Sequence, residues 1–336
     1  MTKVKIVNSL PHNSWINFVE TASSGNIFHT PMIMDVFRDT INYEPYIFSA
    51  FDEESEKIKS LMLVTKVKIF EHFFNKFITR MISYGGIINA ANDENSLASL
   101  LENYDKLFKN KCLFTEIRNI DSTNMFKQDM IAAGYRFDNY LNYILDLKRD
   151  VNQIFKSFSE SRRRNIRTLE KMGANVEEAV NAEDIEIVYA ILDETYSRIQ
   201  VPLADISLFE SLMKHLLKHN LVKFLFVKYK DKTIATLVAL LYKRVIYTWY
   251  YGSTCEFHKF SPESLLIWHI IKWGALNGYS CVDFGGAGRP DENYAVREYK
   301  ARFKGQCVNY GRYIKVYSQT RLKLSKFGYQ LYRKFL

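Results

Sequence analysis

Apolar and polar positions along this chain form two series of predicted elements that follow a similar order. The first series predicts helices at 13–22, 32–40, 95–109 and 125–133, and strands at 46–51, 60–70, 81–84, 113–118 and 141–147. The second series predicts helices at 151–172, 182–198, 207–219 and 262–276, and strands at 174–179, 222–229, 233–242, 245–251, 281–284 and 310–316. We therefore expect two domains of one α/β (α+β) class, residues 1–150 and 151–316, that meet near Asp150.

Glycines follow the strand predicted at 281–284. That strand opens into Gly285, Gly286 and Gly288, where the missing Cβ lets another molecule approach the backbone closely. The next segment, residues 294–305, is dense in aromatic and cationic side chains. Together they predict a site for an anionic or carbonyl-bearing molecule. A tight turn beside a solvated basic face would leave the same pattern.

Composition limits the class of protein. The chain has 336 residues, of which 47% are hydrophobic, so it can form two cores of ordinary size. Its four cysteines form no CxxC pair and its histidines show no metal-ligand spacing, which predicts a reducing compartment and no metal site. The amino terminus lacks the apolar run of a secretory signal, and no stretch reaches the ~20 apolar residues of a membrane span. We expect a cytoplasmic protein.

The net charge of +9 indicates a polyanionic partner. One concentration of charge lies at 162–171, where Arg163, Arg167 and Lys171 would share one face of a helix and Arg162 and Arg164 lie beside them. Such a face fits the phosphates of RNA or a diphosphate, because arginine offers two donors to one phosphate. A solvated helix surface is the alternative.

A second basic segment ends the chain. Residues 317–336 interleave cations with leucine and aromatic residues, and no acid occurs from Arg312 onwards. This pattern predicts a basic amphipathic helix that lies on an anionic membrane, at the inner membrane face, or packs against the protein itself.

Several motifs, taken in order, resemble the FemAB-like family, which comprises the peptidoglycan interpeptide-bridge aminoacyltransferases and related acyltransferases of polysaccharide loci. The resemblance covers nearly the whole chain and is strongest over 250–312. It rests on Ile27-Phe28-His29-Thr30-Pro31, Arg163-Arg164-Asn165-Ile166-Arg167, Tyr250-Tyr251-Gly252-Ser253, Asp283-Phe284-Gly285-Gly286, Tyr299-Lys300 and Phe303-Lys304-Gly305. It implies two tandem GNAT-like domains, each a mixed, mostly antiparallel sheet flanked by helices.

The resemblance also implies a reaction and a donor. Characterised bridge enzymes transfer an aminoacyl group from tRNA to an amine on a peptidoglycan precursor, without a tightly bound cofactor. One departure concerns the acyl donor: acetyl-CoA-dependent GNAT enzymes hold pyrophosphate on a glycine-rich loop, whereas residues 258–264 here contain no glycine, carry Pro262 and place Glu263 in the first turn. We therefore expect an activated acyl donor other than acetyl-CoA bound in the usual GNAT loop. No long helical arm for tRNA appears between 173 and 222, so a donor other than aminoacyl-tRNA stays open.

Lys300 is the first candidate for catalysis, because a fixed cation stabilises the oxyanion that forms when an amine attacks an ester. By resemblance, Tyr299-Lys300 matches the aromatic–lysine pair that faces the donor ester. Asp283, at the end of its strand, would orient or deprotonate the acceptor amine, or it would only hold the glycine turn behind it. The further candidates for substrate binding are Arg198, Arg163, Arg164, Arg167, Tyr251, Gly285, Gly286 and Arg297.

Two functions fit these residues. The first is acyl or aminoacyl transfer to an amine on a lipid-linked or nucleotide-linked envelope precursor, a muropeptide or a glycan, with the carboxy-terminal domain as the catalytic one. The second is a GNAT-like protein without catalysis that binds RNA or an anionic membrane through its basic surfaces.

Overall fold

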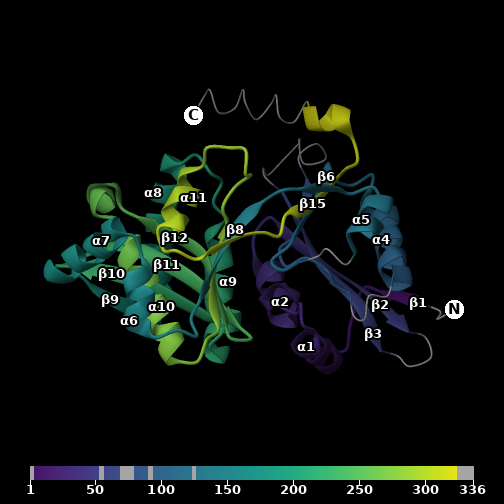
Figure 1. The fold of residues 1–336 in the computed structure, drawn as a ribbon. Helices are drawn as coiled ribbons and strands as arrows, with labels where there is room; N and C mark the ends of the chain where they lie inside the picture. Colours follow the sequence, from purple (N-terminus) through teal and green to yellow (C-terminus); the bar gives the residue numbers. More distant parts are fainter. Residues whose placement is uncertain (1–3, 53–56, 69–78, 90–93, 123–125, 324–336) are drawn as a thin grey trace. The chain divides into compact units, whose positions relative to one another are not determined.

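The computed structural model describes residues 4–52, 57–68, 79–89, 94–122 and 126–323 of the chain (Figure 1). The protein divides into two compact units. The first unit is Met1–Asn139 together with Tyr310–Leu336, and the second unit is Tyr140–Asn309. The chain thus passes between the units twice, at 139–140 and at 309–310, instead of once near Asp150.

Strand pairing explains why the boundaries differ from the predicted ones. Strand β8 (Leu141–Asp146), which we expected in the first domain, pairs with two strands of the second unit. Strand β15 (Arg312–Val316), which we expected in the second domain, pairs with two strands of the first unit. Its Tyr313 is fully buried there, and the ring lies against that of Phe137. Hydrophobic periodicity located both strands but could not say which sheet each one joins.

The first unit is built on an eight-stranded sheet in the order β1-β2-β3-β4-β6-β15-β7, with β5 on β3. Among the described strands of this unit only β4 and β6 pair in parallel. The strands are β1 (Val4–Val7), β2 (Tyr43–Asp52), β3 (Ile58–Val67), β4 (Arg80–Ser83), β5 (Ile88–Asn89), β6 (Phe114–Arg118), β7 (Arg136–Asp138) and β15.

The helices that accompany this sheet are α1 (His12–Thr21), the 3₁₀ turn η1 (Ile27–His29), α2 (Pro31–Asp39), α4 (Glu94–Phe108) and α5 (Lys127–Ala132). As expected from the sequence, Thr30 caps α2: its side chain accepts the Ile33 N–H at 3.2 Å, and Pro31 takes the first helical position. Helix α4 packs Leu97, Leu101 and Tyr104 onto the sheet in one apolar core.

The second unit holds a seven-stranded sheet in the order β14-β8-β13-β12-β11-β10-β9. All described neighbours in it are antiparallel except β12 and β13. The strands are β9 (Asn175–Glu178), β10 (Val222–Tyr229), β11 (Lys232–Tyr242), β12 (Val245–Ser253), β13 (Cys281–Gly286), β14 (Gln306–Asn309) and β8.

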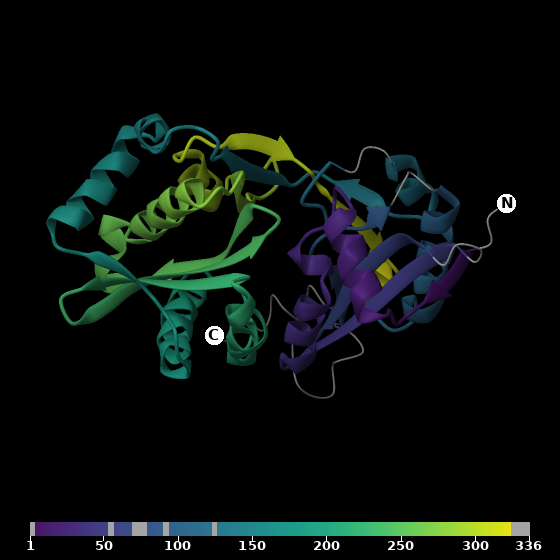
Figure 2. The same ribbon diagram turned by 90° about the horizontal axis from the view of Figure 1, so that it is seen from below.

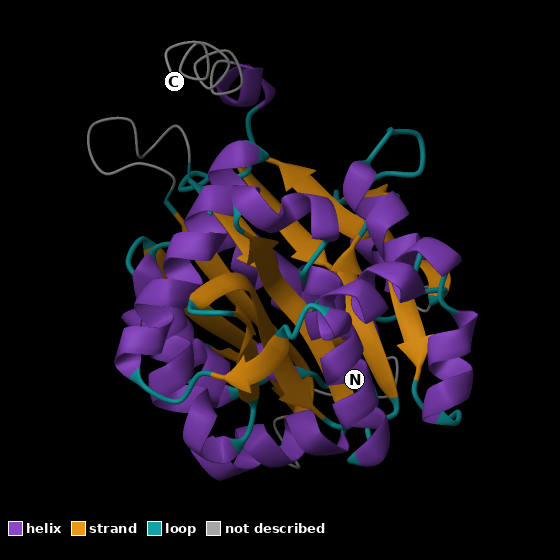
Figure 3. Cartoon of the chain, turned by 90° about the vertical axis from the view of Figure 1, so that its left-hand side faces the viewer, coloured by secondary structure: helices purple, strands orange, loops and turns teal. Residues whose placement is uncertain are grey.

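Helices cover both faces of this second sheet, with α10 on one side and α8 and α9 on the other (Figure 2). Figure 3 shows the helices and strands by colour. Helices α6, α7 and α10 share one core with the sheet. The elements are α6 (Val151–Ser157), α7 (Glu160–Lys171), α8 (Ala182–Arg198), α9 (Ile206–Leu216), η4 (Leu217–His219), η5 (Cys255–Phe260), α10 (Glu263–Leu276) and α11 (Ala295–Ala301).

The single helix predicted at 151–172 is two helices, α6 and α7. The chain is extended at Phe158 and Ser159, and the Ser159 side chain caps α7 by accepting the Arg162 N–H at 3.3 Å. Phe158 itself is buried against Trp268 and Phe303. The break therefore lets an aromatic side chain enter the core between the two helices.

The predicted carboxy-terminal helix is seen only at its start. Residues 319–323 are helical, and the rest of the predicted helix, from residue 324 to 336, lies outside the described residues. In the described part of the chain, no helix combines the length and the apolar character that a membrane crossing requires.

The contribution of β15 to the stability of the first unit can be tested. Tyr313→Ala removes a fully buried ring from β15, which lies between β6 and the edge strand β7, so we expect it to lower the free energy of unfolding of this unit by about 3–5 kcal/mol. Ile131→Ala, at a residue of the same unit that is 54% exposed, should cost less than about 0.5 kcal/mol. Denaturant unfolding followed by amide exchange of the β6 residues measures both. Equal, small effects would show that β15 is not integral to this sheet.

Candidate functional site

The centre of the second unit is the place where its two parallel strands separate. Strands β12 and β13 pair from Val245/Cys281 to Tyr247/Asp283 and no further, although both strands continue. At the same level the pairing of β12 with β11 shifts by one residue between Thr248 and Tyr250. Such a bulge bends its strand. The sheet therefore opens between the ends of β12 and β13, in the middle of the unit.

Lys300 lies in this opening. Its ammonium donates to the carbonyl oxygens of Gly285 at 3.1 Å and of Gly286 at 2.8 Å, and the residue is only 5% exposed. Gly285 has a φ of +70°, a conformation that glycine adopts readily, and this lets the backbone turn its carbonyl to the lysine. The short helix α11, absent from the sequence-based prediction, carries Lys300 to this point.

Asp283 is the buried acid of the site. Its Oδ1 accepts the Asn142 side-chain amide at 2.8 Å and the Gly285 N–H at 2.6 Å. The first of these bonds comes from the neighbouring strand β8, and the second closes the glycine turn. Asp283 thus holds the glycine turn behind it, which was one of the two roles expected from the sequence. The same hydrogen bond connects its carboxyl to the loop that binds Lys300.

Burial perturbs both ionisable groups. Desolvation lowers the pKa of Lys300 from 10.5 to about 8, although the Asp283 carboxylate opposes this change. Desolvation also raises the pKa of Asp283, while the Asn142 amide, the Gly285 N–H and the Lys300 charge oppose the rise. A buried lysine with a lowered pKa next to a buried carboxyl is the kind of perturbed pair that occurs at functional sites.

Two tyrosines form the aromatic wall beside Lys300. The rings of Tyr251 and Tyr299 stack with centroids 5.8 Å apart and planes at 24°. Burial raises the pKa of both hydroxyls, so both are neutral donors at physiological pH. Tyr250, next along β12, points to the other face and packs on Phe209 of α9 and Tyr196 of α8.

The start of α10 is occupied by an acid. Glu263 is 8% exposed and accepts a hydrogen bond from the Ser253 hydroxyl, which lies at the end of β12. The preceding residue, Pro262, offers no N–H. A helix amino terminus usually favours anions, and here the first turn already carries the protein's own carboxylate.

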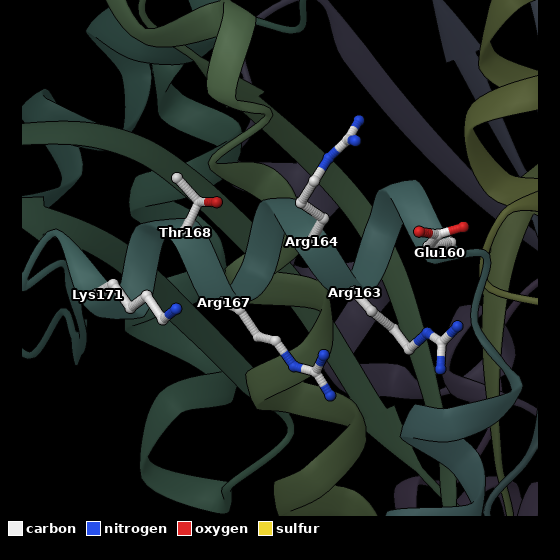
Figure 4. A pocket seen from close by; sticks show the side chains of 6 residues that line it. All are labelled: Glu160, Arg163, Arg164, Arg167, Thr168 and Lys171. Carbon is white, nitrogen blue, oxygen red and sulfur yellow. The ribbon is translucent and has the colours of Figure 1, made fainter.

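The arginines predicted to bind substrate divide into two groups. Arg198 donates to the Ser253 carbonyl at 3.3 Å and so lies beside the end of β12, and Arg297 donates to the carbonyls of Arg289 and Glu292 and holds the loop before α11. Arg163, Arg164 and Arg167 instead line a hollow on α7, together with Glu160, Thr168 and Lys171 (Figure 4). In that view Arg163 and Arg167 extend to one side of the helix, and Arg164 extends to the other.

The first unit has the same parallel pair but different residues around it. Strands β4 and β6 pair from Arg80/Phe114 to Ser83/Ile117, so Glu116 stands in the third pair, where the second unit has Asp283, and it forms ion pairs with Arg118 and Arg312 instead of holding a glycine turn. Beyond that point, the Asn26 side chain donates to the Gly85 carbonyl at 3.0 Å. A Cβ at Gly85 would lie 2.4 Å from Asn26 and 2.9 Å from Phe28, so η1 packs tightly over this turn. The buried lysine and the glycine carbonyls that accept from it belong to the second unit.

Two contributors were missed at the sequence level. Asn142, which holds Asp283, was predicted only as part of a strand. Arg162 was grouped with the surface arginines, yet it is 1% exposed and its guanidinium lies over the Tyr299 ring at 4.2 Å. The spacing along α7 did carry a signal, since Arg162, Ile166 and Leu169 follow one another at i, i+4 and i+7 on the buried face.

Comparison with known proteins agrees with this architecture. Residues 156–301 match the profile of the acetyltransferase (GNAT) domain family. The crystal structure of FemX superposes with a TM-score of 0.71 at 14% identity and covers 95% of this chain and 99% of that chain. L-PGS from Bacillus licheniformis gives a TM-score of 0.57 at 15% identity, with 91% of each chain covered. No curated protein sequence matches the chain.

A third structure shows the duplication itself. A tandem GNAT protein from the clavulanic acid biosynthesis pathway covers 94% of this chain and 99% of that chain, at 7% identity and a TM-score of 0.59. The predicted fold class is thus confirmed, and the resemblance to FemAB-like proteins is confirmed at the level of the fold. The chain consists of two tandem GNAT-like units, and its second unit contains the segment that matches the GNAT domain family.

Proposed function

We propose that this protein transfers an acyl or aminoacyl group to an amine on a cell-envelope precursor, a lipid-linked or nucleotide-linked muropeptide or glycan. The observation that carries the proposal is the Lys300 ammonium, held in the opening between β12 and β13 by the carbonyls of Gly285 and Gly286. A buried charge of this kind costs stability, so a structural role alone is a poor reason to keep it. The fold of FemX adds support for the choice of acceptor.

The reaction we propose is aminolysis of an activated ester or thioester. The acceptor amine attacks the carbonyl carbon, a C–N bond forms and the carbonyl oxygen becomes an oxyanion. Collapse breaks the bond to the leaving oxygen or sulfur, which takes up the proton that the amine releases. An ammonium has three donors, and two of those of Lys300 go to glycine carbonyls, so the third can meet the oxyanion.

Asp283 supports this role in two ways. Its charge partly offsets the desolvation of Lys300 and so favours the ammonium form. Its bond from the Gly285 N–H fixes the turn whose carbonyls bind the lysine. Tyr251 and Tyr299 would line the side of the donor, and Arg198 would contact the acceptor near the end of β12.

For the donor, we propose aminoacyl-tRNA or another activated acyl group, without a tightly bound cofactor and without acetyl-CoA in the usual GNAT position. The support is Glu263, because it puts a negative charge in the first turn of α10, where a pyrophosphate would need free N–H groups. The protein would act in the cytoplasm, with a peripheral contact to the membrane through its basic carboxy-terminal segment.

One observation favours a second candidate function. The hollow on α7 gathers Arg163, Arg164, Arg167 and Lys171, and the Arg167 guanidinium is supported by the Phe155 ring at 5.4 Å. Four cations on one helix repel one another unless an anion meets them. A protein that binds RNA or an anionic membrane without catalysis would also use this surface, and turnover separates the two candidates.

The first prediction concerns activity. Lys300→Met should lower the rate of acyl transfer by about 10²–10³-fold, because it removes the donor to the oxyanion. Purified envelope precursors are incubated with aminoacyl-tRNA or acyl thioesters, and mass spectrometry identifies the added group. Ribonuclease treatment of the donor distinguishes tRNA from other donors. Lys230→Met, at an exposed residue of the same unit, serves as the control. Full activity of Lys300→Met would refute the assignment.

A second prediction concerns stability and pH. Because the pKa of Lys300 is lowered from 10.5 to about 8, burial of its charge costs up to about 3 kcal/mol below pH 8, and the cost disappears as the pH rises from 8 towards 10.5. Lys300→Met should therefore be more stable than the natural protein at pH 7, and the gain should shrink at pH 9.5. Denaturant unfolding at the two pH values measures the difference. A gain that is independent of pH would contradict the lowered pKa.

The third prediction tests the basic hollow. Changing Arg163, Arg167 and Lys171 together to Glu should weaken RNA binding and lower the slope of log affinity against log salt by about one for each phosphate that the protein no longer neutralises. The same change at the exposed cations Lys109, Lys111 and Lys127 of the first unit is the control. Equal effects of the two triple variants would show that the hollow is not a specific anion surface.

A further inference from the structure

The second buried cation of the site is Arg162, on α7. It is 1% exposed, and its guanidinium lies against two rings that meet edge to face, 4.2 Å from the centroid of Tyr299 and 4.7 Å from that of Phe303. It donates to the Ser264 hydroxyl at the start of α10 and to the Tyr299 carbonyl at 3.4 Å. Three helices, α7, α10 and α11, therefore meet at one side chain.

The buried acid Glu263 directly precedes Ser264, but it forms no ion pair with Arg162. In the part of the chain that the structure describes, Arg162 has no acid within ion-pair distance, and its Nε has no hydrogen-bond partner. A buried cation without an ion pair is costly, and the two ring faces recover only part of that cost. Leu or Met would fill an apolar core between α7 and α11 at lower cost, so the guanidinium needs a reason other than packing.

Arg162 contacts residues that adjoin Lys300 and residues that adjoin the carbonyls to which Lys300 donates. Tyr299, which Arg162 touches through the ring and the carbonyl, directly precedes Lys300. Phe303, the other ring, stacks on Phe284 with centroids 5.4 Å apart and planes at 27°. Phe284 lies between Asp283 and Gly285 on β13, so the guanidinium is linked to the lysine through one ring and to the lysine's carbonyl partners through the other.

We propose that Arg162 is the positioning residue of Lys300: its guanidinium clamps α11 onto the end of β13, so that the ammonium stays at the Gly285 and Gly286 carbonyls. The catalytic meaning of this position rests on the function proposed above, but the position itself does not. Arginine suits the task because a planar guanidinium can lie against two rings while its fork donates at the edge. Lysine offers a point charge that cannot do both.

The test follows Lys300 itself, without any assay of activity. Full-length protein is labelled with ¹³C at the lysine Cε, and the signal missing from Lys300→Met identifies Lys300. In Arg162→Met and Arg162→Lys we expect the midpoint of its titration to rise by about one pH unit or more, a tenfold change in the protonation ratio, because the ammonium would leave its buried place for water. Asp283, which also acts on Lys300, is unchanged in both variants.

The matched control is Leu169→Ala, a fully buried position on the same helix and in the same core. It should lower the unfolding temperature and leave the Lys300 midpoint unchanged. A folded Arg162→Met protein with the natural midpoint would overturn the proposal. If Arg162→Met does not fold, Arg162→Lys decides, since it keeps the charge and loses only the stacked plane and fork.

Activity then separates this inference from the proposed function. If the natural protein transfers no acyl group but the Arg162 variants shift Lys300, the positioning role stands and the proposed function fails. If transfer occurs and Arg162→Lys lowers kcat while KM changes little, both stand. Transfer with an unchanged kcat and an unchanged Lys300 midpoint in a folded Arg162→Lys protein would remove the positioning role alone.

Discussion

The second unit depends on one electrostatic constraint, the burial of an ammonium between two strands that have separated. A sheet that opens in its middle leaves backbone carbonyls without ladder partners, and a buried cation needs acceptors. In this protein one contact satisfies both requirements, because Lys300 donates hydrogen bonds to the carbonyls of Gly285 and Gly286. The glycines, the Asp283 turn, the aromatic wall and Arg162 can all be understood as conditions for that contact. The first unit, with Glu116 at the corresponding position and η1 packed over its glycine turn, has no buried cation among its described residues.

The two units show how one fold, present twice in a chain, can carry different side chains around the same parallel pair of strands. Both keep a parallel pair in an otherwise antiparallel sheet. In the first unit the turn beyond that pair is held by Asn26 and covered by side chains from η1. In the second unit, charged side chains from α7, α10 and α11 enter the interior near it. The polar interior of the second unit is thus a property of its side chains and not of the fold.

Much of this could be predicted from the sequence, and the misses have physical causes. Local periodicity gave nearly every long strand and helix, and the capping of α2 by Thr30 was visible in the residues themselves. The sequence did not show which sheet β8 and β15 join. Strand pairing depends on residues far apart in the chain, and the two sheets are similar. Lys300 and Asp283 were selected by their place after a strand and by a family resemblance. Arg162 was misjudged because a run of arginines suggests a solvated face, and only the helix phase shows that one of them points inwards.

The return of β15 has a consequence for how the protein is made. The second unit is continuous from Tyr140 to Asn309, whereas the first unit lacks a strand until Tyr310 and later residues are synthesised. On the ribosome, the usual order in which the amino-terminal domain folds first would be reversed or delayed. While the second unit folds, the nascent first unit would expose the edges of β6 and β7. During this time a chaperone could bind these edges or another strand could pair with them wrongly. In a permuted chain that begins with residues 310–336, followed by residue 1, β15 would be synthesised first and the first unit would not have to wait for it.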